Sequence, residues 1–129
     1  MVTLTGDIDG KTGLIPTNIS DVDYLEYSRK LKRVMFHIGN KVLYAAGTFE
    51  YWVDLIRNSG YTNFMIVDRN NAVNLNNIKL LDPVFKKAYF EYEISDRVNG
   101  GCSMSWDKYN KVNELIGVHS PNAKIITNL

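Results

Sequence analysis

The sequence predicts a mostly β domain with two helices, one in the middle of the chain and one near its C-terminal end. Two observations support this prediction. Several short runs of β-favouring residues are separated by turn signals, and only two segments place apolar residues at helical spacing. The length of 129 residues fits one domain with a single substantial core, and 45% hydrophobic and 22% charged residues are ordinary for a globular protein.

The expected strands are short and mostly alternate between apolar and polar residues. In the run from 34 to 38, for example, Val34, Phe36 and Ile38 would share one face. A proline ends the first run at Pro16, and Gly39-Asn40 and Asn99-Gly100-Gly101 mark turns. We expect strands at 13–16, 22–27, 34–38, 41–46, 64–68, 71–73 running on towards 81, 84–92 and 102–104.

The mid-chain helix follows Gly47, with Thr48 as a plausible N-cap and Gly60 where a left-handed residue would end it. Its apolar stripe, which we expect to be buried, has the spacing i, i+3, i+4, i+7 and consists of Phe49, Trp52, Val53 and Ile56.

The C-terminal helix is predicted from Trp106 to Ile116, capped by Ser105 and stopped by Gly117. One side of this helix would carry Trp106, Tyr109, Val112 and Ile116. We expect Trp52 and Trp106 to be core residues and not parts of a ligand cage, with exposure of Trp106 on a DNA-facing loop as the alternative.

Charge and cysteine content limit the functions that the chain can have. A formal net charge of +1 provides no global attraction to nucleic acid, so any DNA binding must come from a local patch. The single cysteine, Cys102, excludes an internal disulfide framework. Neither a signal peptide nor an apolar run of membrane-spanning length is present, which favours the cytoplasm and no membrane partner.

No catalytic, metal or cofactor motif stands out. The two histidines, His37 and His119, and Cys102 are too far apart in sequence for a zinc site. The carboxylates from Asp21 to Glu26 resemble a metal cluster only superficially, and no Gly-rich loop joins a strand to a helix. We therefore expect neither an enzyme nor a bound cofactor or metal.

Two segments suggest nucleic-acid contacts. Arg69, Asn70 and Asn71 lie at the tip of a predicted hairpin, where arginine can bind guanine and asparagine can bind adenine through two hydrogen bonds. Residues 29–33 hold four cations in five positions: Arg29, Lys30, Lys32 and Arg33. Both segments also fit ordinary turns, because asparagine favours tight turns and charged residues favour solvated hairpin tips.

Three motifs stand in order between about residue 13 and about residue 117. Ile15-Pro16 is followed by the stretch Asp21 to Glu26, Thr48 to Trp52 opens the predicted mid-chain helix, and the predicted hairpin and the residues after it carry Phe64, Arg69, Val73, Asn74 and Ile78. In this order they resemble the opening motif, the mid-helix motif and the central motif, Phe-x-Arg-x-His-Arg-Ser-Tyr-x-Val-Asn-x-x-x-Ile, of the LytTR-type DNA-binding domain of bacterial transcription regulators.

The sequence also departs from the family pattern. Ile66 replaces the first motif arginine, Asp68 stands at the usual histidine, and Asn70-Asn71 replace Ser-Tyr. Ser105-Trp106 stands where the family often has Ser-Arg. Asp68 could orient Arg69 through a charge-assisted bond, or it could repel phosphate.

The resemblance implies layered short antiparallel sheets, with 13–117 as the domain. The small, polar, Gly-spaced residues 1–12 suggest a loose N-terminal segment or short edge strand, and the mostly polar residues 118–129 suggest a tail. The resemblance also implies DNA contacts from three loops, in which the proposed contact residues are Arg29, Lys30, Lys32, Arg33, Arg69, Asn70, Asn71, Ser105, Trp106 and Lys108. Lys86, Lys87 and Lys111 could add contacts to the DNA backbone.

The expected function is sequence-specific duplex DNA binding in transcription regulation, through loops inserted in the major groove. The protein could act as a homodimer on repeated half-sites or with a partner regulator. Family members commonly carry a receiver domain ahead of this module; this chain has none, so we expect no control by phosphorylation in cis. The alternative is a protein-interaction module that keeps this fold, has lost its DNA contacts and modulates a partner regulator.

Overall fold

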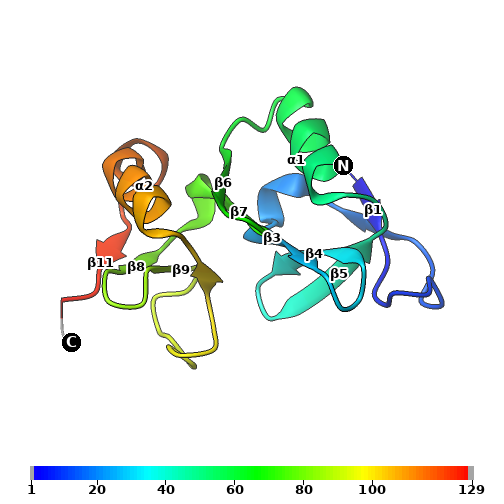
Figure 1. The fold of residues 1–129 in the computed structure, drawn as a ribbon, viewed down its shortest axis with the longest axis horizontal. Helices are drawn as coiled ribbons and strands as arrows, with labels where there is room; N and C mark the ends of the chain where they lie inside the picture. The colour runs from blue at the N-terminus through cyan, green and yellow to red at the C-terminus, as the bar shows by residue number, and fades with distance from the viewer. Residues whose placement is uncertain (1, 128–129) are drawn as a thin grey trace.

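The computed structural model describes residues 2–127, which form two helices and three sheets (Figure 1). The strands are β1 (Val2–Leu4), β2 (Ile15–Thr17), β3 (Tyr24–Ser28), β4 (Arg33–Ile38), β5 (Lys41–Ala45), β6 (Phe64–Asp68), β7 (Asn71–Asn74), β8 (Leu80–Asp82), β9 (Lys87–Tyr89), β10 (Cys102–Ser103) and β11 (Lys124–Ile125). The helices are α1 (Phe49–Asn58) and α2 (Trp106–His119), with short 3-10 turns at Ile19–Asp21 and Leu75–Asn77. The prediction of a mostly β fold with a mid-chain and a C-terminal helix is confirmed.

The largest sheet has five strands in the order β5-β4-β3-β7-β6, all antiparallel. A second sheet has the order β10-β9-β8-β11, in which β11 runs parallel to β8 and the other pairs are antiparallel. The third is the pair β1-β2, so the N-terminal residues 2–4 form an edge strand. Figure 1 shows α1 over the five-stranded sheet, and α2 with β8, β9 and β11 at the other end of the molecule.

Strand β7 separates two hydrophobic cores. Its four residues are all buried, and neighbouring side chains point to opposite faces of the sheet. Ala72 packs into the first core, under α1, while Val73 packs into the second core, between β7 and α2. The two halves of the molecule therefore share one central strand.

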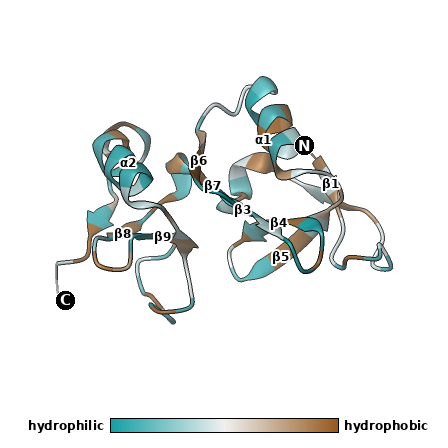
Figure 2. Ribbon diagram, in the orientation of Figure 1, coloured by the Kyte–Doolittle hydropathy of each residue, from teal (hydrophilic) through white to brown (hydrophobic). Residues whose placement is uncertain are grey.

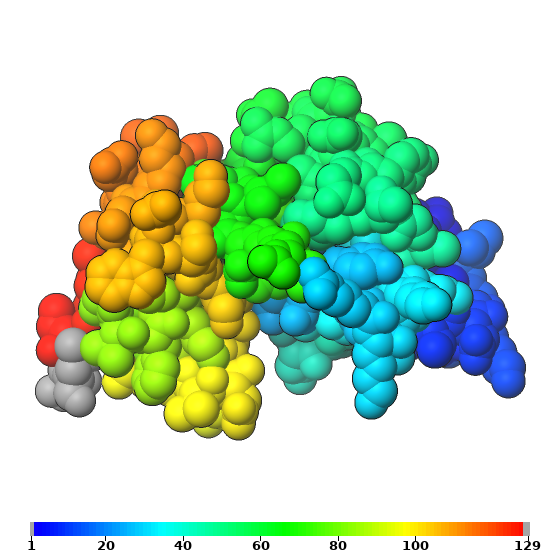
Figure 3. Space-filling view, in the orientation of Figure 1, coloured from blue at the N-terminus to red at the C-terminus, as the bar shows by residue number. Residues whose placement is uncertain are grey.

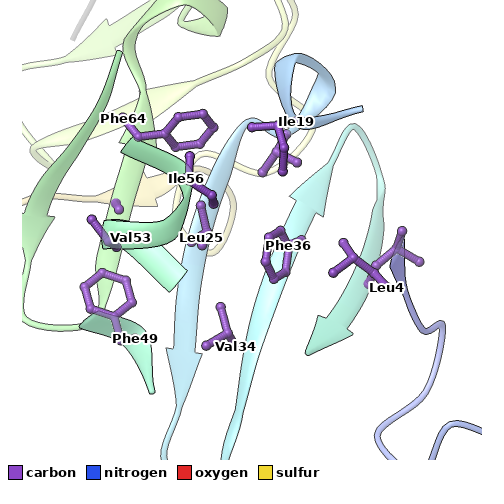
Figure 4. Close-up of a cluster of buried hydrophobic side chains, with 12 residues drawn as sticks. Leu4, Ile19, Leu25, Val34, Phe36, Phe49, Val53, Ile56 and Phe64 are labelled. Atoms are coloured by element: carbon purple, nitrogen blue, oxygen red, sulfur yellow. The ribbon is translucent and has the colours of Figure 1, made fainter. Parts of the chain in front are cut away.

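Helix α1 forms where the sequence predicts it and for the predicted reasons. The Thr48 hydroxyl accepts a hydrogen bond from the Tyr51 N–H at 3.1 Å, and Gly60, with a φ of +102°, follows the last turn. Figure 4 shows Phe49, Val53 and Ile56 of this helix close to Leu25 of β3. The helix alternates between hydrophilic and hydrophobic residues in Figure 2, as an amphipathic helix does.

Trp52 is the exception in the predicted buried stripe, because it is only partly buried. Its indole N–H donates to the Ala46 carbonyl at 2.7 Å, and its ring meets Phe36 edge-on at 5.3 Å between centroids. The polar edge of the indole thus stays near the surface while the ring covers the core.

Several element boundaries differ from the prediction, and two strands differ most. The strand expected at 84–92 begins only at Lys87, because the Asp82 carboxylate accepts the N–H groups of Val84 and Phe85 and holds residues 83–86 in a turn. The continuous run expected from 71 towards 81 is interrupted by the 3-10 turn at Leu75–Asn77.

Helix α2 does not stop at Gly117 but continues to His119. Contacts with a distant segment hold its last turn: the Ser120 hydroxyl donates to the Leu75 carbonyl at 2.8 Å, and His119 Nδ1 lies 2.9 Å from Asn76 Oδ1. Tertiary contacts therefore override the local glycine signal.

Asn74 is the most fully bonded polar side chain at the end of β7. Its amide nitrogen donates to the Val22 carbonyl at 2.9 Å, and its amide oxygen accepts from Asn63 Nδ2 at 2.6 Å and the Asn76 N–H at 3.0 Å. The side chain is 1% exposed, so water cannot replace these partners.

We expect Asn74→Ala to lower the free energy of unfolding by about 1–3 kcal/mol, because buried partners lose their hydrogen bonds. Urea unfolding measures this loss. Asn70→Ala is the matched control: the Asn70 side chain makes no hydrogen bond within residues 2–127, so the change should stay within about 0.5 kcal/mol. Equal stability of the two variants would contradict the structural role of Asn74.

Candidate nucleic-acid interface

The basic loop and the β6–β7 hairpin tip lie side by side. Strand β3 runs towards the loop at residues 29–32, and β7 runs antiparallel to β3, with Glu26 opposite Asn71. One step further, the Tyr27 N–H donates to the Asn70 carbonyl at 2.8 Å. Arg69, in the β6–β7 turn, is therefore placed next to the end of β3, where the basic loop begins.

The third segment, residues 103–108, is tied to the same hairpin by two hydrogen bonds. The Asn71 amide donates to the Ser103 carbonyl at 2.9 Å, and the Ser105 N–H donates to the Val67 carbonyl at 2.8 Å. Figure 3 shows the result on one face of the molecule: the green hairpin lies between the orange start of α2 and the light-blue β3–β4 loop. We call the three segments 29–32, 68–70 and 103–108 the loop face.

The basic loop presents three of its four cations. Arg29, Lys30 and Lys32 are exposed. Ser28 closes the loop, because its carbonyl accepts the Lys32 N–H at 2.8 Å and its hydroxyl accepts the Leu31 N–H at 3.1 Å. Lys32 takes a left-handed conformation with a φ of +55°.

Arg33 lies apart from the other loop cations. Its Nε donates to the Ile8 carbonyl at 3.3 Å and its Nη1 to the Lys32 carbonyl at 2.9 Å. These bonds hold the guanidinium against the N-terminal segment. Of the four cations of this loop, Arg33 is therefore the one engaged within the fold.

At the hairpin tip, Arg69 is exposed and Asn70 is half-buried. Asp68 bonds to the Arg69 backbone: its carboxylate accepts the Arg69 N–H at 2.7 Å. Within residues 2–127 it forms no ion pair with the guanidinium. Asn71 is only 7% exposed, and its amide is bonded to Ser103, so its side chain joins two loops and is not free to reach a ligand.

The start of α2 contributes Ser105, Trp106 and Lys108, all exposed. The prediction that Trp106 is a core residue is wrong: its side chain is 70% exposed. Trp106 is the first residue of the helix, and a helical side chain points back towards the N-terminal end, beyond the core that Tyr109 and Val112 fill. Ser105 is the N-cap residue, but its hydroxyl makes no capping hydrogen bond.

The loop face is locally basic although the chain is nearly neutral. The exposed acids of its three segments are Asp68 and Asp107. The cations of the face, together with the partly buried Lys86 of the adjoining turn, are Arg29, Lys30, Lys32, Arg69, Lys86 and Lys108. None of these six belongs to the three ion pairs found within residues 2–127, which are His37–Glu26, Arg97–Asp82 and Lys111–Glu114. The positive charge of this face is therefore available to an anionic ligand.

The Asp82–Arg97 ion pair, which no local sequence pattern predicts, supports the turn beside the loop face. Arg97 Nε and Nη2 donate to the buried Asp82 carboxylate at 2.6 and 3.0 Å. Burial by itself raises the pKa of Asp82, but the Arg97 guanidinium and the N–H groups of Val84 and Phe85 outweigh it and hold the pKa below its usual range. Burial also raises the pKa of Tyr89, whose hydroxyl donates to the Arg97 carbonyl, to about 12.

The other notable polar residues serve structure. His37 Nε2 lies 2.9 Å from Glu26 Oε1, and its ring stacks on Tyr24 at 4.0 Å between centroids. Burial raises the pKa of the Cys102 thiol well above its ordinary value. Within residues 2–127, no three His, Cys, Asp or Glu side chains come together as metal ligands. Neither helix of that range has the length and apolar character needed to cross a membrane.

Comparisons with known proteins support the fold. No protein-family profile matches the sequence, and no curated protein matches it. The structure is similar to a solved LytTr DNA-binding domain from Bacillus cereus, part of a protein described as a methyl-accepting/DNA response regulator. The match has a TM-score of 0.65 and 20% sequence identity, and it covers 90% of this chain and 95% of that one. The chain therefore has the fold of a LytTr DNA-binding domain.

We expect Lys32→Gly to leave stability unchanged or to raise it by up to about 1 kcal/mol, because glycine takes the left-handed conformation that costs lysine about 1–2 kcal/mol. Urea unfolding measures the change. A loss of more than about 1 kcal/mol would show that the Lys32 side chain stabilises the fold, and would contradict its assignment to the loop face as a ligand contact.

Proposed function

We propose that this protein binds duplex DNA sequence-specifically and regulates transcription, with the loop face inserted in the major groove. One observation carries the proposal: three segments distant in sequence meet at one edge and present cations that no acid of the described chain neutralises. The likeness of the fold to a LytTr DNA-binding domain supports it. The protein would act in the bacterial cytoplasm, where chromosomal DNA lies, as a binding protein and not as an enzyme.

The segments would divide the work of recognition. Lys30 and its neighbours in the basic loop form a dense, exposed group of cations, which suits contacts to phosphates. Arg69 lies at the tip of a two-stranded ribbon, a shape that the major groove admits, and its guanidinium can form two hydrogen bonds to guanine. Asn70 lies beside it and could bind an adenine edge.

A second function is favoured by a different observation. Asp68 lies beside Arg69 at the hairpin tip, Ile66 of the same strand β6 is 41% exposed, and Trp106 is exposed on the loop face. Exposed apolar side chains beside mixed charge suit a protein partner, so this region could bind a partner regulator instead of DNA. The proportion of cations on the loop face favours DNA.

The first test is binding of the pure protein to a pool of random duplex DNA, followed by selection of preferred sites. With four to six contacts to DNA, the logarithm of the binding constant should fall with the logarithm of salt concentration with a slope of about −4 to −5. Fluorescence anisotropy between about 50 and 200 mM salt measures this slope. If no duplex binds at low salt, DNA binding is excluded and the interaction module remains.

The second test separates base reading from charge. Arg69→Ala should lose about 1–3 kcal/mol on the selected site and relax the preference at one base pair. Lys30→Ala should weaken all sequences alike and make the salt slope shallower by about one unit. Asp68→Asn keeps an oxygen to accept the Arg69 N–H and removes a negative charge, so it should strengthen binding to every duplex.

Lys41→Ala is the matched control for these variants, because β4 runs away from the basic loop and Lys41 follows the turn at the far end of this strand. It should leave both affinity and slope unchanged. Equal losses on selected and random duplex for Arg69→Ala would make Arg69 a phosphate contact, and no loss at all would favour the interaction module.

A further inference from the structure

Lys86, in the β8–β9 turn, occupies an unusual position. Its Nζ lies 4.0 Å from the centroid of the Trp106 ring and 4.9 Å from that of Tyr109, so one ammonium group contacts two aromatic rings. Its backbone has a φ of +54°. Within the described residues, the only non-glycine residues with a positive φ are Lys86 and Lys32 of the basic loop.

The turn that carries Lys86 is fixed to the loop face. The Met104 N–H donates to the Lys86 carbonyl at 2.9 Å, which joins the turn to the segment 103–108. On its other side, the turn is held by the Asp82 carboxylate through the N–H groups of Val84 and Phe85. Lys86 is therefore held rigidly beside the loop face.

Lys87, the next residue and the first of β9, is a lysine with a structural role. Lys87 is 9% exposed, and its Nζ donates to the carbonyls of Val98 and, at 2.9 Å, Gly100. Lys86 has no such acceptor: within residues 2–127 its ammonium makes no hydrogen bond or ion pair. The rings orient this charge without neutralising it.

The exposed indole of Trp106 supports the same role for Lys86. Trp106 is 70% exposed at the start of α2, where burial gives no reason for a tryptophan. Because cation–π attraction is strongest with tryptophan, this ring limits the movement of an otherwise flexible lysine side chain. Lys86 has a left-handed backbone, and its ammonium group is ordered by two rings and has no hydrogen-bond acceptor among the described residues. These features suit an anionic ligand.

We propose that the β8–β9 turn is a fourth DNA-contacting segment, in which Lys86 donates to a backbone phosphate and Trp106 and Tyr109 are the positioning residues that hold its ammonium group. This inference rests on the proposed function and adds a residue from outside the three loops. It also explains why Trp106 can stand where the family pattern often has an arginine. Trp106 brings no cation itself, and the cation comes from Lys86 in the neighbouring turn.

The test uses the full chain and the selected duplex. Lys86→Asn removes the charge and puts in a residue that tolerates the left-handed conformation better than lysine does, so the urea midpoint should not fall. Loss of one phosphate contact should make the salt slope shallower by about 0.9. If the variant and the wild type bind equally at 1 M salt, the variant should then bind about 8-fold more weakly at 0.1 M salt. Lys86→Arg, which keeps the charge, should retain the slope.

Lys79→Asn is the matched control, because Lys79 Nζ also lies over an aromatic ring, 5.5 Å from the centroid of Tyr92. Lys79 lines the same pocket as His119, the last residue of α2. The 14 residues of this helix place His119 about 20 Å from Trp106, so Lys79 lies far from the loop face. This variant should keep the wild-type affinity and slope. An equal loss for Lys79→Asn would assign the effect to overall charge and overturn the proposal.

The positioning role is tested by Trp106→Leu in two backgrounds. If the ring acts through Lys86, Trp106→Leu should weaken binding in the wild type and have much less effect on Lys86→Asn. Full additivity of the two changes would overturn the positioning role. An unchanged slope for Lys86→Asn overturns this inference alone, whereas the absence of any duplex binding by the wild type overturns the proposed function and this inference together.

Discussion

The whole arrangement depends on β7, a strand buried on both faces and bonded at both ends through asparagine side chains. At one end, Asn74 binds the Val22 carbonyl ahead of β3; at the other, Asn71 binds the Ser103 carbonyl ahead of α2. A buried amide is costly unless its hydrogen bonds are made, so these bonds admit very few alternative arrangements of the chain. They fix where both halves of the molecule lie relative to the central sheet.

The loop face follows from this constraint. Strand β7 pairs with β3 and β6 and contacts β10. The loops that follow β3, β6 and β10 therefore emerge side by side and form the loop face. A chain with a net charge of only +1 thereby gathers six unpaired cations on one surface. Asn71 provides the link, so an amide that resembles a base-reading residue in the sequence acts instead in assembling the face.

Stability and the proposed DNA binding would use different residues in this molecule. Asp82, Arg97 and Lys87 make their hydrogen bonds inside the second half of the fold, whereas Lys32 and Lys86 keep free ammonium groups on strained backbones. Glycine or asparagine would relieve that strain, so the lysines are more readily explained by a ligand than by folding. Trp106 belongs with them, because it adds exposed apolar surface and orders a charge.

The sequence by itself determined the fold class, the two helices, the Thr48 cap and the basic loop, because these depend on residues within a few positions of one another: alternation, helical spacing and turn chemistry act locally. Only the tertiary structure decided that Asn71 is buried, that Trp106 is exposed, that α2 passes Gly117 and that Lys86 joins the loop face. Each depends on partners distant in the chain, such as Ser103, Leu75 and Trp106, and the pairing of such partners is set by packing, which local spacing does not encode.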